Sequence, residues 1–383
     1  MILFAAHYPD KLNEQEGMSQ RISSIDSIFQ KEDRVYLVAF FNPFDFTPAS
    51  YKRINEKVEV YRLNIARHDH YKKIVELVDK AEFVYVHSLY YSRGLLPLYD
   101  RNIFITDMHG VVPEEEAYKG NVKLKEHFDA IEKKILQKSD LIITVTNSML
   151  KHYKHKYKDV DFKALVLPII DKNIEGDEVD LNRNTKSVIY AGGVQNWQNI
   201  DAMIGSIKKN VDKYKFTILT PNIAEFESKL KASGIASNVV LKSVPRPQVS
   251  SYYKESDYGY ILRDNSIVNK VACPTKLIEY MSYGVVPIVL NEEMGDFKTF
   301  GYSFLSLNNF DQTTDVDVNR LVEMRKNNLH VIKRIKALFS SSKEFLINYK
   351  PVKIGFKRNN NYLVCFGQIF FEFLIKKIRQ YSR

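Results

Sequence analysis

Residues 263–290 read RDNSIVNKVACPTKLIEYMSYGVVPIVL and contain the clearest structural pattern of this 383-residue chain. Residues 258–262 just before this stretch and residues 285–290 at its end are short apolar runs of strand type. Between the runs, Pro274 suits the first turn of one helix, and Gly284 fits just past its end, where positive φ is favoured. The pattern predicts a βαβ unit.

Three polar residues lie at the start of this predicted helix. Such a helix begins at the carboxyl ends of the strands, where its unbonded N–H groups and positive dipole end attract phosphate. Thr275 and Lys276 lie in the first turn, and Glu279 follows on the same face about one turn later. Lys276 can neutralise a diphosphate, and the Glu279 carboxylate can accept two hydrogen bonds from a ribose diol. The spacing suits a nucleotide diphosphate, and a surface Lys/Glu pair is the alternative.

The run PTKLIEYMSYGVVPIV, residues 274–289, resembles a signature of nucleotide-sugar-dependent glycosyltransferases of the GT-B fold. It is most similar to family 4-like bacterial enzymes that assemble surface polysaccharides. The resemblance implies an α/β chain of two Rossmann-like domains facing across a cleft. It further implies that Glu279 binds the donor's ribose and that Thr275 and Lys276 meet its diphosphate.

The chain departs from the family pattern at one carboxylate. Family 4 enzymes commonly carry two glutamates separated by seven residues, but Val271 stands eight residues before Glu279, where the first glutamate would be. The donor-sugar contact usually given to that glutamate therefore has no counterpart in this sequence.

A second departure follows the predicted first strand of the second half. Gly192 and Gly193 come directly after that strand and let the backbone approach a ligand closely. The family has an arginine and a lysine near this loop, but Gly193 and Gln198 stand at those positions. Lys276 must then carry more of the phosphate charge, and Arg263 is the candidate for assisting it.

The loop SVPRPQ, residues 243–248, matches the place where this architecture holds the base. The resemblance makes Val244 and Arg246 candidate donor contacts. Trp197, the single tryptophan, is expected in packing, with substrate stacking as the alternative.

The first half is predicted to be a separate α/β domain. Residues 2–6 have strand character, and Gly17 is expected in the loop after them as a further donor contact. Asp107 and His109 follow the strand-like residues 103–106, at a carboxyl end where α/β folds place their chemistry.

His109 is the candidate catalytic residue of this half, beside Lys276 in the other. In the family a histidine of this region contacts the donor sugar near the reacting carbon, whereas a structural role is the alternative for a lone histidine. Asp107 or Glu114 would be the base only if the enzyme inverted the anomeric configuration. Glu114, with Glu115 and Glu116, is expected at a solvated helix start.

The domain boundaries follow from these assignments and from a polar stretch in the middle of the chain. We expect an acceptor-binding domain over residues 1–165, a linker over 166–185, a nucleotide-sugar-binding domain over 186–345 and a tail over 346–383.

The tail accounts for most of the net charge of +10. Residues 350–383 hold eight basic residues and one acidic residue, a net +7, so the remaining charge is nearly balanced and does not indicate nucleic-acid binding. Gln368, Glu372, Lys376 and Arg379 form one polar stripe beside aromatic and aliphatic residues. The pattern predicts an amphipathic helix that lies on an anionic membrane surface, or one that docks on the first domain.

Composition limits the environment of the protein. Two cysteines are too few for a disulfide framework, and we expect no leader and no spanning segment. A cytoplasmic protein, peripheral on the inner face of the cell membrane, is expected. The only Asp-x-Asp motifs, Asp159-Val-Asp161 and Asp315-Val-Asp317, lie in polar stretches, so we expect neither a metal nor a cofactor beyond the nucleotide-sugar donor.

The predicted activity is that of a metal-independent, retaining hexosyltransferase. It would move a sugar from a nucleotide-diphosphate sugar to a glycan or lipid-linked acceptor in the synthesis of bacterial surface polysaccharide, capsule or lipopolysaccharide. Two alternatives remain, a sugar-nucleotide epimerase of the same fold and a noncatalytic partner subunit of another transferase.

Overall fold

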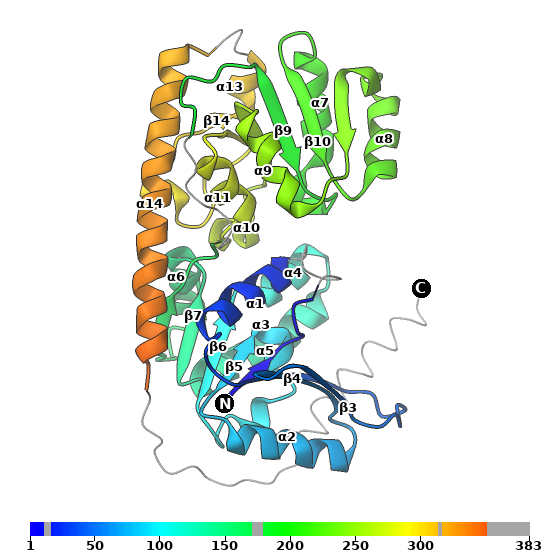
Figure 1. Ribbon diagram of the computed structural model, residues 1–383, viewed down its shortest axis with the longest axis vertical. Coiled ribbons are helices and arrows are strands. Elements are labelled where there is room, and N and C mark those ends of the chain that lie inside the picture. Colours follow the sequence, from blue (N-terminus) through cyan, green and yellow to red (C-terminus); the bar gives the residue numbers. More distant parts are fainter. Residues whose placement is uncertain (11–16, 171–178, 313–315, 351–383) are drawn as a thin grey trace. The chain divides into compact units, whose positions relative to one another are not determined.

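The computed structural model describes residues 1–10, 17–170, 179–312 and 316–350 (Figure 1). The chain divides into two compact units, one formed by Met1–Leu167 with Ser341–Arg383 and the other by Pro168–Ser340. Within the described ranges, none of the helices combines the length and the apolar character that crossing a bilayer requires.

The first unit is built on an eight-stranded sheet in the order β3-β4-β2-β1-β5-β6-β7-β8. All its neighbouring strands are parallel except β3, which pairs with β4 in antiparallel fashion. The strands are β1 (Ile2–Ala5), β2 (Arg34–Phe40), β3 (Ser50–Asn55), β4 (Val58–Asn64), β5 (Val84–His87), β6 (Phe104–Met108), β7 (Leu141–Thr144) and β8 (Ala164–Val166). The helices are α1 (Gly17–Ile28), α2 (His68–Lys80), α3 (Ser88–Ser92), η1 (Leu96–Leu98), α4 (Val112–Tyr118), α5 (Val122–Lys138) and α6 (Asn147–Lys156).

The second unit has a six-stranded parallel sheet in the order β11-β10-β9-β12-β13-β14. Its strands are β9 (Ser187–Ala191), β10 (Lys215–Leu219), β11 (Val239–Lys242), β12 (Tyr258–Ile261), β13 (Val286–Val289) and β14 (Leu305–Ser306). Its helices are η2 (Asn196–Gln198), α7 (Ile200–Asn210), α8 (Ile223–Ala232), η3 (Ala236–Asn238), α9 (Arg246–Lys254), α10 (Ile267–Val271), α11 (Thr275–Ser282), α12 (Phe297–Phe300) and α13 (Leu307–Gln312). Helix α14 (Val318–Asn348) begins in this unit, and its last residues belong to the first.

Apolar residues at helical spacing fix the helices on this second sheet. Met203 and Ile207, one turn apart on α7, are fully buried in one cluster with Val188 of β9 and Phe216 of β10. Each buried side chain of this size contributes about 1.5–3 kcal/mol relative to exposure. The strand ends are thereby held in fixed positions.

The predicted βαβ unit is present. Strands β12 and β13 pair in parallel with Tyr258 opposite Val286, and Gly284 has the expected positive φ of 70°. The prediction of one intervening helix was wrong, because α10 and α11 are separate. Pro274 lacks an N–H group and disfavours helical backbone in the residue before it, and Ala272 ends α10 in an extended conformation.

Gly17 is the first residue of α1 and not part of a loop, and a Cβ atom added there would have no atom within 4 Å. The predicted amphipathic tail helix falls on residues after Lys350, which the structure does not describe. Within the first unit, the end of α14 is bonded to β8, since Ser342 Oγ donates to the Val166 carbonyl over 2.7 Å.

In each sheet the strand order reverses beside the first strand of the unit. Strand β1 lies between β2 and β5, and β9 lies between β10 and β12. In open parallel sheets, ligands bind at such a reversal, outside the carboxyl ends of the strands. The loop after β9 contains Gly192 and Gly193, and Arg263 is the second residue after the end of β12. The topology therefore brings three of the predicted donor contacts to one edge.

Candidate functional site

The start of α11 offers unbonded N–H groups at this edge of the second sheet. Pro274 precedes the helix without any side-chain cap, and the Leu277 N–H donates to the Pro274 carbonyl. Among the described residues, the N–H groups of Thr275 and Lys276 have no acceptor. Unbonded N–H groups at the positive end of a helix dipole form a binding site for an anion.

Tyr280 anchors α11 against the strands. Its hydroxyl accepts from the Ala191 N–H at 3.2 Å and donates to the Ile189 carbonyl at 3.4 Å. A Cβ atom on Gly259 of β12 would collide with the Tyr280 ring, so glycine is needed there for this close packing. The helix start is thereby fixed next to the end of β9.

The Lys276 ammonium group lies over the loop after β9. It is 4.2 Å from the centre of the Tyr190 ring and 3.5 Å from Gln198 Oε1. A Cβ atom on Gly192 would overlap with the Lys276 ammonium, so glycine at this position makes room for the cation. Tyr190 also donates from its hydroxyl to the Gly193 carbonyl over 2.6 Å. Lys276, Gly192 and Gly193, predicted separately, therefore belong to one site.

Two cations share this site without a carboxylate between them. Burial, together with the positive charge of Arg263, lowers the pKa of Lys276 to about 7. Burial also lowers the pKa of Arg263, whose guanidinium donates to Asn269 Oδ1 at 3.3 Å. In the part of the chain that the structure describes, neither cation has a carboxylate oxygen within 4 Å. A bound anion would offset the cost of burying both charges.

Glu279 lies one turn further along α11 and is held from α9. Arg246 donates from Nη2 to one carboxylate oxygen at 3.1 Å, and the Tyr253 hydroxyl donates to the other at 2.9 Å. Arg246, predicted as a base contact, is thus an ion-pair partner of Glu279. Val244, the other predicted base contact, is half-buried in the loop after β11, and Val271 is buried at the end of α10.

In the first unit, Asp107 is the buried centre of a hydrogen-bond network at the end of β6. Arg21 of α1 donates to both of its carboxylate oxygens, at 2.8 and 3.1 Å, and Tyr85 donates to one of them at 2.9 Å. Burial would raise the pKa of Asp107, but the charge and hydrogen bonds of Arg21, together with the nearby imidazoles of His109 and His87, outweigh burial and lower the pKa to about 2. Asp107 is therefore a poor candidate for a base.

Glu114 is likewise an ionised carboxylate that is held by neighbouring side chains. His152 Nε2 lies 3.1 Å and Lys156 Nζ 2.7 Å from its Oε1 atom. These bonds outweigh burial and lower the pKa of Glu114 to about 2. The expectation of a solvated glutamate run was wrong, because Glu114 and Glu115 are half-buried and Glu116 is buried, bonded to Lys119 and Asn121.

His109 follows β6 and is half-buried. Burial lowers the pKa of its imidazole, which keeps the ring neutral at pH 7. Its Nε2 atom is buried, and no described residue accepts from it or donates to it. A neutral imidazole can offer one donor and one acceptor to a sugar hydroxyl.

Sequence reasoning missed two other histidines at the same edge of the first sheet. His87 ends β5, and its ring centre is 6.2 Å from that of His109. His7, just after β1, bonds to Tyr91 and Ser19 through its two ring nitrogens. Ser88, next to His87, has a strained φ of 67°. Both histidines lie at the carboxyl ends of strands, and this position was the feature of the sequence that could have identified them as candidate site residues.

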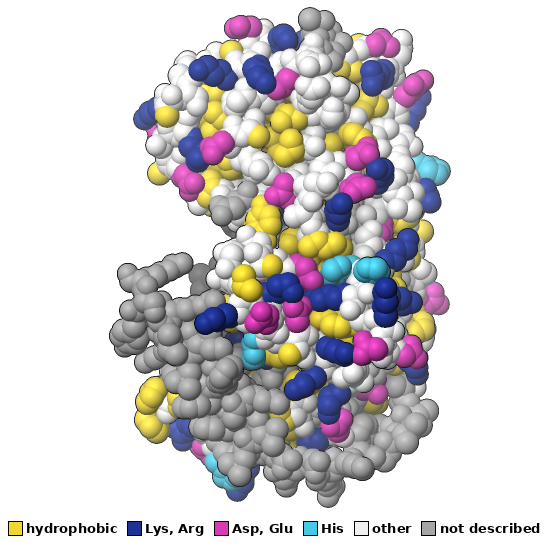
Figure 2. Space-filling model, turned by 180° about the vertical axis from the view of Figure 1, so that it is seen from behind, with side chains coloured by type: hydrophobic (Ala, Val, Ile, Leu, Met, Phe, Trp, Pro, Cys, Tyr) yellow, Lys and Arg dark blue, Asp and Glu magenta, His cyan; other side chains and the backbone are white. Residues whose placement is uncertain are grey.

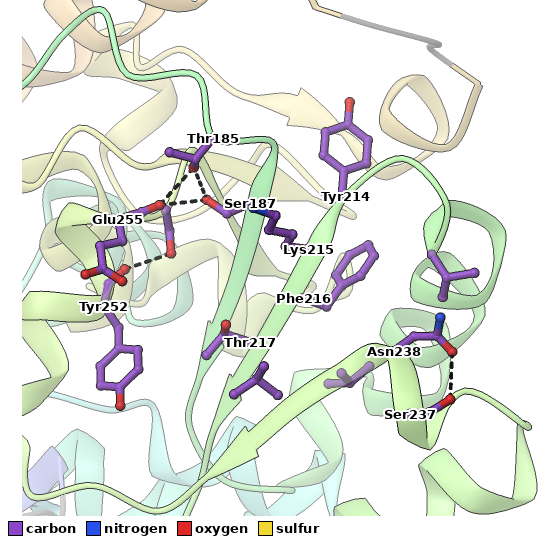
Figure 3. Close-up of a pocket in the computed structure, with 14 residues that line it drawn as sticks. Thr185, Ser187, Tyr214, Lys215, Phe216, Thr217, Ser237, Asn238, Tyr252 and Glu255 are labelled. Atoms are coloured by element: carbon purple, nitrogen blue, oxygen red, sulfur yellow. Dashed lines mark hydrogen bonds between the residues drawn. The ribbon is translucent and has the colours of Figure 1, made fainter.

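An open groove of about 610 Å³ lies elsewhere on the second unit (Figure 3). Its lining includes Ser187, Lys215 and Val239, the first residues of β9, β10 and β11. It therefore lies at the amino ends of the strands, whereas Lys276 and Arg263 lie at the carboxyl edge. The groove is not the candidate donor site.

Comparison with known proteins identifies the fold. No protein-family model matches the chain, and no curated protein matches it in sequence. A similar solved structure is sucrose-phosphate synthase from Thermosynechococcus elongatus, with 13% identity and a TM-score of 0.66 over 90% of this chain and 96% of that one. An alpha,alpha-trehalose-phosphate synthase (UDP-forming) from Burkholderia vietnamiensis has 10% identity and a TM-score of 0.62, covering 91% and 96%.

The pneumococcal O-GlcNAc transferase GtfA, in complex with UDP and GlcNAc, is more distant in structure. It has 14% identity and a TM-score of 0.53 over 79% of this chain and 70% of that one. These proteins have the GT-B architecture. The present chain has it too, which confirms the predicted fold class of two Rossmann-like domains.

Proposed function

We propose that this protein is a glycosyltransferase that uses a nucleoside-diphosphate sugar as donor. The observation that carries the proposal is the pair of cations, Lys276 and Arg263, beside the unbonded N–H groups of α11, with the Glu279 carboxylate one turn away. The cations match a diphosphate and the carboxylate matches a ribose. The similar structures named for UDP or for sugar-phosphate synthesis support the same class of donor.

The chemistry of the proposed reaction follows from charge. The sugar passes through an oxocarbenium-like state while negative charge builds on the departing diphosphate. Lys276, Arg263 and the N–H groups of α11 would stabilise that charge. The carboxylates of Asp107 and Glu114 are both held in ion pairs, which favours a retaining reaction in which a phosphate oxygen accepts the acceptor's proton.

A panel of UDP-, GDP- and dTDP-sugars tests this function. The protein should slowly release a nucleoside diphosphate from one of them without any acceptor, and mass spectrometry would detect the product. Conversion to an isomeric nucleotide sugar would identify an epimerase instead. Binding without release or conversion would point to a noncatalytic partner subunit.

Replacing Glu279 is expected to weaken donor binding and leave the fold intact. Glu279→Ala removes hydrogen bonds to a charged acceptor, at a cost of about 1.5–3 kcal/mol or roughly one to two decades in affinity. Calorimetry with the best-binding nucleotide sugar measures the change. Glu225→Ala, an exposed carboxylate in the first turn of α8, is the matched control. Unchanged affinity in Glu279→Ala would refute the ribose contact.

We further propose a lipid-linked acceptor and peripheral attachment to an anionic membrane, based on the basic and aromatic composition of residues 350–383. Among the described residues that Figure 2 shows, basic and acidic side chains are mixed. Each basic residue near an anionic leaflet adds about 1 kcal/mol, and salt weakens the attraction.

The full chain should therefore sediment with anionic liposomes at low salt and detach at high salt. A chain that ends at Lys350 should stay in solution at both salt concentrations. Equal sedimentation of the two chains would assign membrane binding to another part of the protein.

A further inference from the structure

The carboxylate of Glu279 is held by two side chains of another helix. Arg246 at the start of α9 donates to one oxygen at 3.1 Å, and Tyr253 near its end donates to the other at 2.9 Å. The two donors come from opposite ends of a nine-residue helix and approach different oxygens. Together they set both the position of the carboxylate and the orientation of its plane.

Tyr253 is the more rigid of the two donors. It is 3% exposed, and its ring packs against those of Tyr280 and Tyr283 at centre distances of 5.2 and 5.7 Å. Burial and the negative charge of Glu279 raise the pKa of the Tyr253 hydroxyl, so it remains a donor at neutral pH. Arg246, in contrast, is 29% exposed along its side chain. The Tyr253 hydroxyl therefore fixes the position of the Glu279 carboxylate more firmly than Arg246 does.

A fixed carboxylate can distinguish a diol from a single hydroxyl group. Two adjacent hydroxyls satisfy two acceptor positions at once, and a sugar that lacks one of them leaves a desolvated acceptor position unsatisfied. A carboxylate that rotates can adapt to either sugar. Selectivity thus depends on the residues that stop the rotation.

We propose that Tyr253 and Arg246 are positioning residues that orient Glu279 toward both hydroxyls of a ribose, so that the site selects ribonucleoside over 2′-deoxyribonucleoside diphosphates. The inference rests on the proposed donor site. It identifies the class of nucleotide and two residues that act on it through Glu279.

Paired binding measurements test the proposal. The affinities of UDP and dUDP, and of GDP and dGDP, are measured for the full chain, and the tighter pair is used. The unsubstituted protein should prefer the ribonucleotide by roughly tenfold or more. Tyr253→Phe keeps the packing of the ring and removes the donor, so it should reduce the preference severalfold while the affinity for the deoxyribonucleotide stays nearly constant.

Tyr252→Phe is the matched control. This neighbouring tyrosine lies on the same helix, but its hydroxyl lies 3.3 Å from the Lys242 ammonium, away from Glu279. Its loss should leave the preference unchanged. Arg246→Met provides a second variant, and it should reduce the preference in the same direction even if Tyr253→Phe folds poorly.

The outcomes separate this inference from the proposed function. Equal losses for both nucleotides in Tyr253→Phe and Arg246→Met would reduce the two residues to a structural role and overturn the inference. A protein that binds diphosphates but has no ribose preference would also overturn it, with the proposed donor site intact. Failure to bind any nucleoside diphosphate would reject the donor site itself.

Discussion

Lys276→Ala is expected to lower the turnover of sugar transfer by roughly 10²–10³ and to weaken donor binding much less. The charge of the departing diphosphate is greatest in the transition state, where the Lys276 ammonium at the start of α11 would act. Steady-state kinetics with a nucleotide sugar and calorimetry of the same donor separate the two effects. Arg263→Ala should act in the same direction with a smaller effect.

The fold should survive this substitution. A lysine whose pKa is about 7 when folded and about 10.4 when unfolded opposes folding at neutral pH, because the unfolded chain binds its proton more tightly. The melting temperature of Lys276→Ala is therefore not expected to fall. Lys270→Ala is the matched control: it removes a cation of α10 that pairs with Glu293, and it should retain its turnover.

The pKa of Lys276 also predicts a pH dependence. Below about pH 7 the ammonium of the ligand-free protein is charged, and above that pH it loses its proton, so donor affinity should fall as the pH rises through this value. A nucleotide sugar is the suitable probe, because its diphosphate is doubly esterified and has no second ionisation near neutral pH.

Full turnover in both Lys276→Ala and Arg263→Ala would show that the phosphate site lies elsewhere.

His109→Ala is expected to abolish most of the sugar transfer, by roughly 10²-fold or more, without reducing the affinity for a free nucleoside diphosphate. The reason is that His109 belongs to the first unit, whereas the proposed contacts with phosphate and ribose all belong to the second. Its neutral imidazole, with Nε2 unbonded among the described residues, suits a sugar hydroxyl. Transfer assays and nucleotide calorimetry on one preparation measure both quantities.

The control for His109→Ala is His155→Ala, which removes an exposed histidine of α6. Both variants should melt near the temperature of the unsubstituted protein. A His109→Ala protein that unfolds, or one that transfers sugar at the normal rate, would favour the structural role for this histidine.

Local patterns in the sequence predicted the parts of the fold that depend on neighbouring residues. Thr275, Lys276 and Glu279 could be placed on one helix because their spacing and the flanking residues Pro274 and Gly284 belong to one short stretch. The same stretch did not reveal that α10 and α11 are separate, since the break depends on the backbone at Ala272 and Cys273.

Contacts between distant residues could not be predicted in this way. Arg21 and Asp107 are 86 positions apart, and only the folded chain shows that their ion pair removes Asp107 as a base. Tyr253 and Glu279 are 26 positions apart, and no periodic pattern marks that tyrosine as a partner. The Lys276 ammonium approaches Gly192 so closely that a side chain there would have no room, and this approach likewise depends on packing across the sheet.

A crystal structure with the best-binding nucleoside diphosphate tests the central claim most directly. The donor site predicts diphosphate oxygens within hydrogen-bond distance of the Thr275 and Lys276 N–H groups, with the ribose hydroxyls on Glu279. The Lys276 ammonium should then bond to the diphosphate. A nucleotide bound at the amino ends of β9, β10 and β11, with Lys276 still lying over Tyr190, would contradict the claim.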